Sequence, residues 1–135
     1  MTREEILKMT KEELNGAMAV KVMGWKIKDF GGWHGKYWVD IDGHAMCSVN
    51  KWNSPEKIED AWRVVMKMAA NGAAPALIND DNGHWALAFD GWQNVPRDDK
   101  PCDIQTCFFV EKDLWHEEPG VAICRAALMA VEGEG

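Results

Sequence analysis

The ten residues 37–46, YWVDIDGHAM, combine a strand pattern with a turn signal. Every second residue from Tyr37 to Ile41 is apolar, which is the period-two pattern of a half-buried β-strand. Asp42 is followed by Gly43, and this dipeptide is typical of tight turns. Residues 44–49 would then return as the second arm. The stretch therefore predicts a β-hairpin.

The same stretch has a second interpretation. On an unbroken strand every second side chain points the same way, so Trp38, Asp40, Asp42 and His44 would share one face. Two carboxylates and an imidazole could bind a metal there or act as acid and base. A reversal at Asp42 breaks that face, because a turn aspartate hydrogen-bonds its own neighbouring backbone. We favour the hairpin and predict neither a metal site nor a catalytic site.

Helix signals lie on both sides of the hairpin. Two capping boxes of the form S/T-x-x-E begin at Thr2 and Thr10, and an apolar stripe at helical spacing follows. We expect a short turn or helix first and then a main helix over about residues 11–23. The stripe consists of Leu14, Met18, Val22 and Trp25.

A second helix is expected after the hairpin. Ser54 would cap it, Pro55 would occupy its first position, and Asn71-Gly72 would end it. Most of the charges of this helix lie on one face, so the opposite, apolar face should point to the core. The residues expected on that buried face are Ile58, Ala61, Trp62, Val65, Met68 and Ala69.

Short strands and a third helix complete the chain. Residues 76–78 and 84–90 predict a hairpin with a five-residue connection, and residues 103–111 predict a further strand of that meander. The helix expected over residues 121–131 has Arg125 as almost its only charge, so most of its surface should be buried.

The order of these elements predicts an α+β fold. Single helices interleaved with runs of strands favour a layered domain with mostly antiparallel pairing. The length of the chain and the lack of a long linker predict one domain over residues 1–135, with a frayed tail at 132–135. We find no internal repeat in the sequence.

Three segments, taken in order, carry a resemblance to a known family. They are AVKVMGW at residues 19–25, EDAWRVVMKM at residues 59–68 and AICRAALMA at residues 122–130. Together they resemble the phage ABA sandwich domain family of small phage and prophage proteins. Members also have a Trp–Asp–Gly hairpin before the second helix, which Trp38, Asp40 and Gly43 match. The resemblance implies a layered α–β–α sandwich, with a mostly antiparallel sheet flanked by three helices. It implies no catalytic residue.

Composition narrows the class of function. A net charge of −7 argues against the electrostatic attraction that drives binding to duplex nucleic acid. No apolar run approaches the roughly 20 residues that a membrane crossing needs, and the N-terminus does not have the pattern of a signal peptide. The four cysteines form no CxxC pair, so we expect reduced thiols rather than disulfides or zinc. We expect a protein of the bacterial host cytoplasm with no cofactor.

The inventory for nucleophilic catalysis is small. Ser48 and Ser54 are the only serines, and neither lies in a G-x-S-x-G elbow. Gly31-Gly32 is too short for a phosphate-binding loop. We therefore predict a protein that is not an enzyme.

Tryptophan is the unusual feature of the composition. The chain has eight, against four phenylalanines and one tyrosine. We expect Trp25 and Trp62 in the core. The other six lie in or beside loops and strand ends, where they could pack under loops or form a recognition surface. The candidate ligand-binding residues are Trp33, His34, Tyr37, Trp38, His84, Trp85, Trp92, Arg97, Lys100 and Arg125.

Two functional hypotheses follow. In the first, a phage protein binds a small molecule in an aromatic pocket and sequesters a nucleotide-derived signal of antiphage defence. In the second, the protein is an interaction or structural module whose surface tryptophans contact another protein. A cleft would favour the first, and a flat or convex patch the second. We expect a homo-oligomer in both cases.

Overall fold

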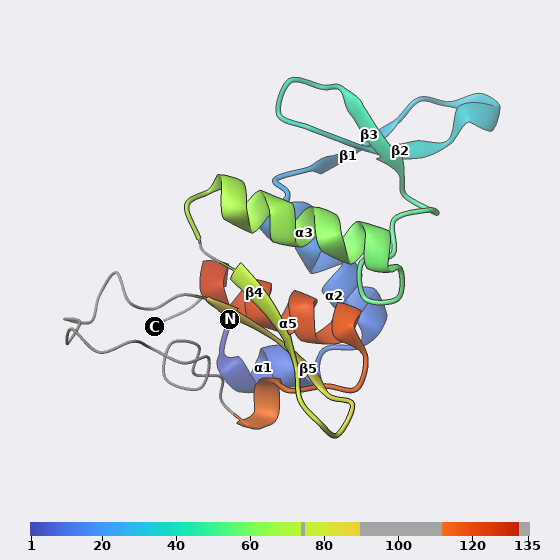
Figure 1. The fold of residues 1–135 in the computed structure, drawn as a ribbon. Helices are drawn as coiled ribbons and strands as arrows, with labels where there is room; N and C mark the ends of the chain where they lie inside the picture. Colours follow the sequence, from blue (N-terminus) through green and yellow to red (C-terminus); the bar gives the residue numbers. More distant parts are fainter. Residues whose placement is uncertain (74, 90–111, 133–135) are drawn as a thin grey trace.

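The computed structural model describes residues 1–73, 75–89 and 112–132 (Figure 1). Two small antiparallel sheets accompany the helices, which confirms the α+β class. The helices are α1 (Arg3–Lys8), α2 (Lys11–Ala17), the π-helix η1 (Met18–Val22), the 3-10 helix η2 (Gly32–His34), α3 (Ile58–Ala70), the 3-10 helix η4 (Lys112–Leu114) and α5 (Pro119–Glu132). The strands are β1 (Lys26–Asp29), β2 (Lys36–Val39), β3 (Ala45–Ser48), β4 (Pro75–Asn79) and β5 (Trp85–Phe89).

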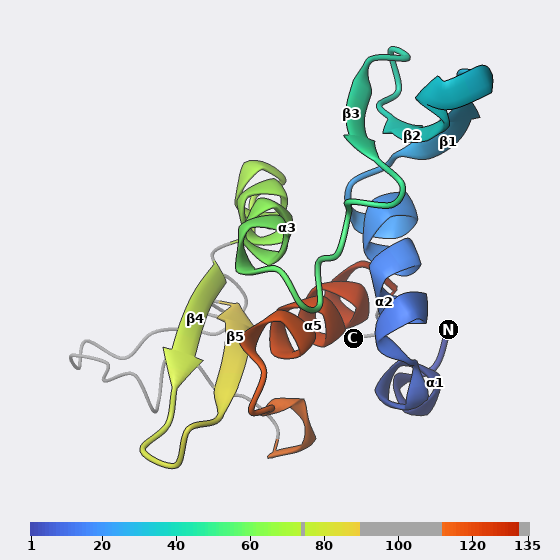
Figure 2. The same ribbon diagram turned by 90° about the vertical axis from the view of Figure 1, so that its right-hand side faces the viewer.

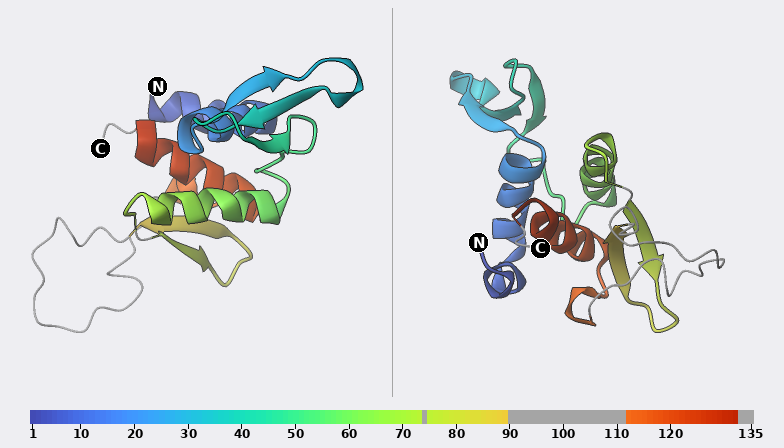
Figure 3. Two further views of the ribbon diagram at one scale, coloured as in Figure 1. Left: turned by 90° about the horizontal axis from the view of Figure 1, so that it is seen from above. Right: turned by 90° about the vertical axis from the view of Figure 1, so that its left-hand side faces the viewer.

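Helix α5 occupies the centre of the molecule. It contacts α1, α2 and η1 on one side and α3 and β5 on the other (Figures 2 and 3). Eight of its residues are buried, as the nearly uncharged sequence predicted. The meander β1–β2–β3 projects from one end of this body, and the β4–β5 hairpin lies beyond α3 and α5 from it.

The N-terminal predictions are confirmed. Both capping boxes form. The Thr2 and Thr10 hydroxyls each accept a backbone N–H, and the carboxylates of Glu5 and Glu13 accept the backbone N–H groups of Thr2 and Thr10. All four residues of the predicted stripe are buried. The helix over residues 11–23 has one local change, because its second half is a π-turn in which the Met23 N–H donates to the Met18 carbonyl.

The strands differ from the prediction in their grouping. The hairpin of β2 and β3 is present, but β1 adds a third strand before it, so the three-stranded meander precedes α3. Polar residues at alternate positions of β1 gave no clear strand signal. The β4–β5 hairpin is confirmed, and the strand predicted over 103–111 lies outside the described residues.

The start of α3 was predicted wrongly. The helix begins at Ile58 and not at Pro55, and Ser54 does not cap it. Residues 53–57 form a turn instead, closed by the Lys57 N–H on the Asn53 carbonyl at 2.8 Å. Ser54 is fully buried, and its polar groups are satisfied because Asn15 Oδ1 accepts its backbone N–H at 2.8 Å and its hydroxyl at 3.2 Å. The serine therefore anchors the turn to α2.

The buried face of α3 is also rotated from the predicted one. Ala61, Val64, Val65 and Met68 are buried. Ile58 and Ala69 are exposed, and so is Trp62, which is 47% exposed and does not belong to the core. The helix is apolar on two adjoining faces, so helical spacing alone fits either of them. An apolar stripe of Ile58, Trp62 and Met66 remains on the surface.

At the C-terminal end, α5 continues to Glu132, whose carboxylate lies 2.6 Å from the Lys21 ammonium. Residues 133–135 lie outside the described residues. None of the helices in the described ranges is long and apolar enough to cross a membrane.

Candidate functional site

The tryptophans divide into buried and exposed groups. Trp25, Trp38 and Trp52 are buried, whereas Trp33 is 90% exposed. Trp85 and Trp115 are half-buried, and Trp92 lies outside the described residues. The core therefore takes up three of the indole rings, and Trp33 and Trp62 remain on the surface.

Two of the buried rings form a structural cluster. Trp25 and Trp52 meet edge to face, with centroids 4.8 Å apart, and the Arg63 guanidinium lies 5.2 and 5.6 Å from the two centroids. The Trp52 indole N–H donates to the Asn15 carbonyl at 3.1 Å. This cation–π cluster fixes the chain at the base of the meander against α2 and α3.

The two faces of the meander have different neighbours. Ile27, Trp38 and Cys47 are aligned across the strands, and Cys47 interacts with Asp60 and Arg63 of α3. Trp38 on this inner face is buried, and its indole N–H finds no hydrogen-bond partner in the described part of the chain. Trp38 is thus separated from Tyr37, which points to the opposite, outward face.

The outward face carries an aromatic hollow. Phe30, His34, Tyr37 and Ala45 line an open hollow of about 420 Å³. The Phe30 and Tyr37 rings meet edge to face at 5.6 Å. Trp33 stacks on His34 with centroids 4.0 Å apart, and the Lys28 ammonium lies 5.2 Å from the Phe30 centroid. We call Phe30, Trp33, His34 and Tyr37 the aromatic face.

Glycine makes the shape of this face possible. Gly31 and Gly35 flank η2 with φ of 77° and 75°, a region that residues with a Cβ rarely adopt. The turn is held by the Gly31 N–H, which donates to Asp29 Oδ1 at 2.8 Å. The loop can therefore turn within a few residues and place Trp33 and His34 beside β2. The sequence named Trp33, His34 and Tyr37, but its pattern did not show that Phe30 joins them.

The other predicted candidates do not join this face. His84 and Trp85 lie on the β4–β5 hairpin, away from the meander (Figure 2). The Trp85 backbone pairs with His116 through bonds of 2.6 and 2.8 Å. Arg97 and Lys100 lie outside the described residues. The structure therefore places His84 and Trp85 in a different part of the molecule from Trp33, His34 and Tyr37.

Arg125 has a mainly structural environment. One of its terminal nitrogens donates to the Leu7 carbonyl at 3.3 Å, which ties α5 to α1. Its Nε is buried and finds no partner within the described ranges. The pKa of His116 is lowered, first by partial burial and then by the positive charge of Arg125.

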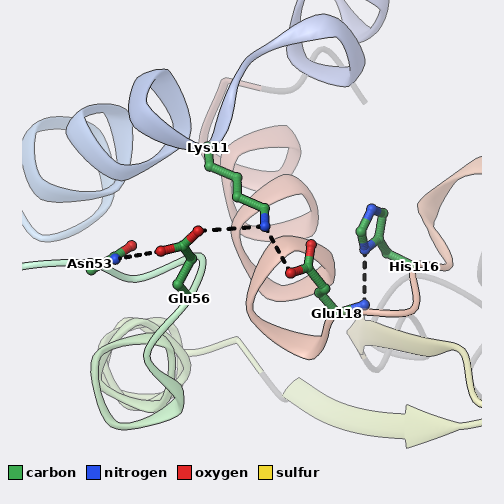
Figure 4. A network of polar contacts seen from close by, with 5 residues as sticks. All are labelled: Lys11, Asn53, Glu56, His116 and Glu118. Atoms are coloured by element: carbon green, nitrogen blue, oxygen red, sulfur yellow. Dashed lines mark hydrogen bonds and ion pairs between the residues drawn. The ribbon is translucent and has the colours of Figure 1, made fainter.

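A polar network surrounds the N-terminal end of α5 (Figure 4). The Lys11 ammonium lies 2.8 Å from Glu118 and 3.5 Å from Glu56, and the Asn53 amide also donates to Glu56. These contacts raise the pKa of Lys11, chiefly through Glu118, and lower the pKa of Glu56, chiefly through Asn53. The network joins α2, the turn before α3 and the residue before α5, and the single ammonium of Lys11 is shared by two carboxylates.

Burial disfavours the thiolate form of two cysteines, Cys47 and Cys124. It raises the pKa of Cys124 to about 12, and the Cys124 thiol donates to the Ser54 hydroxyl at 3.5 Å. Partial burial also raises the pKa of Cys47. A nucleophilic cysteine needs the opposite shift, so neither thiol has the environment of a nucleophile.

The stretch from Tyr37 to Met46 is a hairpin. The Asp40 N–H donates to the His44 carbonyl at 3.0 Å, and the Gly43 N–H donates to the Asp40 carbonyl at 3.0 Å. Asp40 Oδ1 accepts the N–H groups of Asp42 at 3.0 Å and His44 at 2.8 Å. The reversal occurs where Asp42-Gly43 predicted it. We call residues 40–44 the first tip.

A second loop repeats this arrangement. Residues 80–84, DDNGH, match residues 40–44, DIDGH, as D-x-[DN]-G-H. In this second tip Asp80 Oδ1 accepts the N–H groups of Asn82 at 2.9 Å and His84 at 2.8 Å. The carboxylate–imidazole distance, from Oδ2 to Nδ1, is 3.4 Å in both tips. The expectation of no internal repeat therefore missed a local one, because the match covers only five residues.

These hydrogen bonds predict how the tips respond to acid. The pKa of Asp40 is lowered chiefly by the His44 N–H and then by that of Asp42, and the pKa of Asp80 is lowered in the same way by His84 and Asn82. A lowered carboxyl pKa stabilises the fold above the unfolded-state pKa, and this contribution is lost as pH falls through the folded-state value. Carbon-detected NMR titration should give pKa values for Asp40 and Asp80 below that of an ordinary aspartate. Ordinary pKa values for both would contradict the backbone hydrogen bonds to these two carboxylates.

Comparisons with known proteins agree with the resemblance seen in the sequence. The profile of the family described as the phage ABA sandwich domain matches residues 17–128. The match extends from the end of α2 into α5 and includes the meander and the aromatic face. Searches of curated proteins and of solved structures found no match. The match covers most of the chain, and the protein therefore belongs to the phage ABA sandwich domain family.

Proposed function

We propose that this phage protein is a non-catalytic binding protein whose aromatic face holds a small planar anionic ligand. The class of ligand we propose is a nucleotide-derived signal of antiphage defence, sequestered in the cytoplasm of the bacterial host. The observation that carries the proposal is the hollow between Phe30, His34 and Tyr37, with Trp33 stacked at its border.

The chemistry of the hollow suits a planar ring. Tyr37 and Phe30 offer ring surfaces, and stacking of a base on an aromatic side chain contributes about 1–3 kcal/mol. The volume of about 420 Å³ lies within the usual range of small-molecule sites, roughly 300–1,000 Å³. One ring of a nucleotide could therefore be bound here without a change of fold.

The charges beside the hollow suit an anionic group. Lys28 lies over Phe30 and is aligned with Tyr37 across the β1–β2 pair. The carboxylate of Asp29 nearby is engaged with the Gly31 N–H. Within a chain of net charge −7, Lys28 gives a phosphate a local positive partner.

Fluorescence titration tests this proposal. Cyclic nucleotides and ADP-ribose derivatives form the panel, and a ligand that stacks near Trp33 should quench its emission. Tyr37→Ala should weaken binding about tenfold, the size expected for the loss of one stacked ring. Trp62→Ala is the matched control, because that tryptophan is also surface-exposed but lies on α3, and it should leave affinity unchanged. Failure of every panel member to bind would remove support for the nucleotide class.

A second candidate function is supported by a different surface. Ile58, Trp62 and Met66 are 48%, 47% and 56% exposed and form one stripe along α3. Such a stripe suits a protein partner, a second copy of this chain included. Light scattering at micromolar concentration should then show an oligomer that Trp62→Ser converts to a monomer. A monomeric native protein would argue against self-association through α3.

A further inference from the structure

The two hairpin tips have a feature that the turn itself does not require. The carboxylate Oδ1 of Asp40 accepts two backbone N–H groups, and one of them belongs to His44. Any residue other than proline would supply that N–H. The imidazole is nonetheless present in both tips, and in each its Nδ1 faces Oδ2, the carboxylate oxygen that these two bonds leave unused.

The distance between these atoms is informative. A separation of 3.4 Å is longer than the usual 2.7–3.2 Å of an N–H···O hydrogen bond. Two donors bound to one tetrahedral zinc ion, with bonds of about 2.0–2.1 Å, lie about 3.3–3.4 Å apart. The spacing therefore fits two ligands of one tetrahedral metal ion as well as it fits a direct carboxylate–imidazole contact.

A third donor distinguishes the first tip from the second. Asp40, Asp42 and His44 each offer one ligand atom, and these three atoms lie within 4.8 Å of one another. Asp42 is exposed, so its side chain can rotate toward the other two. The second tip has Asn82 at the corresponding position, and a neutral amide is a weaker ligand than a carboxylate.

We propose that the first tip binds a divalent transition-metal ion through Asp40 Oδ2, Asp42 and His44 Nδ1, and that the second tip binds it more weakly through Asp80 and His84. Three protein ligands leave the fourth position of a tetrahedral ion open. Ala45, the residue after His44, lines the aromatic hollow, whereas none of the three proposed metal ligands is among its lining residues. The metal site does not depend on the ligand proposed for the hollow, and its test uses the metal alone.

The experiment is a calorimetric titration of tag-free protein with Zn²⁺ at pH 7, with Co²⁺ absorption as a second readout of tetrahedral coordination. The native chain should bind with micromolar affinity. His44→Gln and Asp42→Asn should each weaken the stronger site about tenfold or more, because each removes one of three ligands. Glu59→Gln is the control, since this exposed carboxylate on α3 lies outside both tips and outside the aromatic face, and it should leave Zn²⁺ binding unchanged.

The second tip provides the reciprocal test. Asn82→Asp supplies the missing carboxylate and should raise the affinity of that tip toward that of the first. His44→Gln and Asp42→Asn keep the backbone N–H groups that close the first tip, so circular dichroism and the melting temperature of these variants should stay close to native. No Zn²⁺ binding up to millimolar concentration, or binding that His44→Gln leaves unchanged, would overturn the proposal. An Asn82→Asp variant that gains no affinity would overturn the three-ligand assignment.

Discussion

Replacing Gly120 with alanine is expected to lower the free energy of unfolding by about 3 kcal/mol, at the upper end of the usual cost of overpacking. Gly120 is buried in the first turn of α5. A Cβ built there would collide with the Pro55 carbonyl oxygen, lie 2.7 Å from the Pro55 carbonyl carbon and lie 2.9 Å from the Ser54 carbonyl oxygen. These are backbone atoms, so no side-chain rotation can relieve the contact.

Displacing the first turn of α5 would disturb its packing against several elements. Helix α5 contacts α1, α2, η1, α3 and β5, so moving its first turn away from the turn at residues 53–57 disturbs several contacts together. For a domain of this size, a loss of about 3 kcal/mol lowers the melting temperature by roughly 10 °C. Urea unfolding followed by circular dichroism gives the free energy directly.

Gly16 provides the matched control. It lies in α2, and a Cβ there would meet nothing within 4 Å. Gly16→Ala should raise the free energy of unfolding by about 0.5–1 kcal/mol, because alanine loses less backbone entropy in a helix than glycine. The same chemical change thus has opposite expected signs at two positions. Equal effects of the two substitutions would show that α5 does not approach Pro55 as closely as described.

The capping boxes and the first apolar stripe could be predicted because their signals are local. Thr2 and Thr10 need only a glutamate three residues on, and the stripe from Leu14 to Trp25 has one apolar face. On α3 the signal was ambiguous, because Trp62 and Val64 lie on different apolar faces, and the contacts of α3 with α5, η1 and β4 decide between them. Tertiary contacts, which a periodicity does not contain, therefore determined the buried face.

The candidate site could likewise be predicted where its residues are close in sequence, and not where tertiary contacts bring them together. Trp33, His34 and Tyr37 are close in sequence, and the structure keeps them together. Trp38 is the next residue after Tyr37, and strand alternation turns it to the other face. Phe30 reaches the hollow because β1 pairs with β2, and the residues of β1 carry little strand signal. The aromatic face thus depends on a strand pairing that composition does not reveal.

Among the described residues, Asn15 makes three polar contacts with a large expected contribution to stability, and no sequence motif marks it. Its side-chain amide donates to the Trp52 carbonyl at 2.7 Å, and its Oδ1 accepts the Ser54 N–H and hydroxyl. Asn15→Ala leaves these groups without partners beside a fully buried Ser54, and a buried polar group without a partner costs about 1–3 kcal/mol. We expect a loss of about 2–4 kcal/mol in the free energy of unfolding, measured by urea titration.

Two further substitutions show whether the loss comes from these bonds. Asn15→Asp keeps an acceptor for Ser54 but cannot donate to the Trp52 carbonyl when ionised, so its effect should be intermediate. Asn53→Ala removes the same side chain from the neighbouring turn, where it only donates to the exposed Glu56 carboxylate, and should change stability by less than about 0.5 kcal/mol. If Asn15→Ala were as mild as Asn53→Ala, water would have to satisfy the Ser54 and Trp52 groups, and the contact of this turn with α2 would contribute little to the stability of the fold.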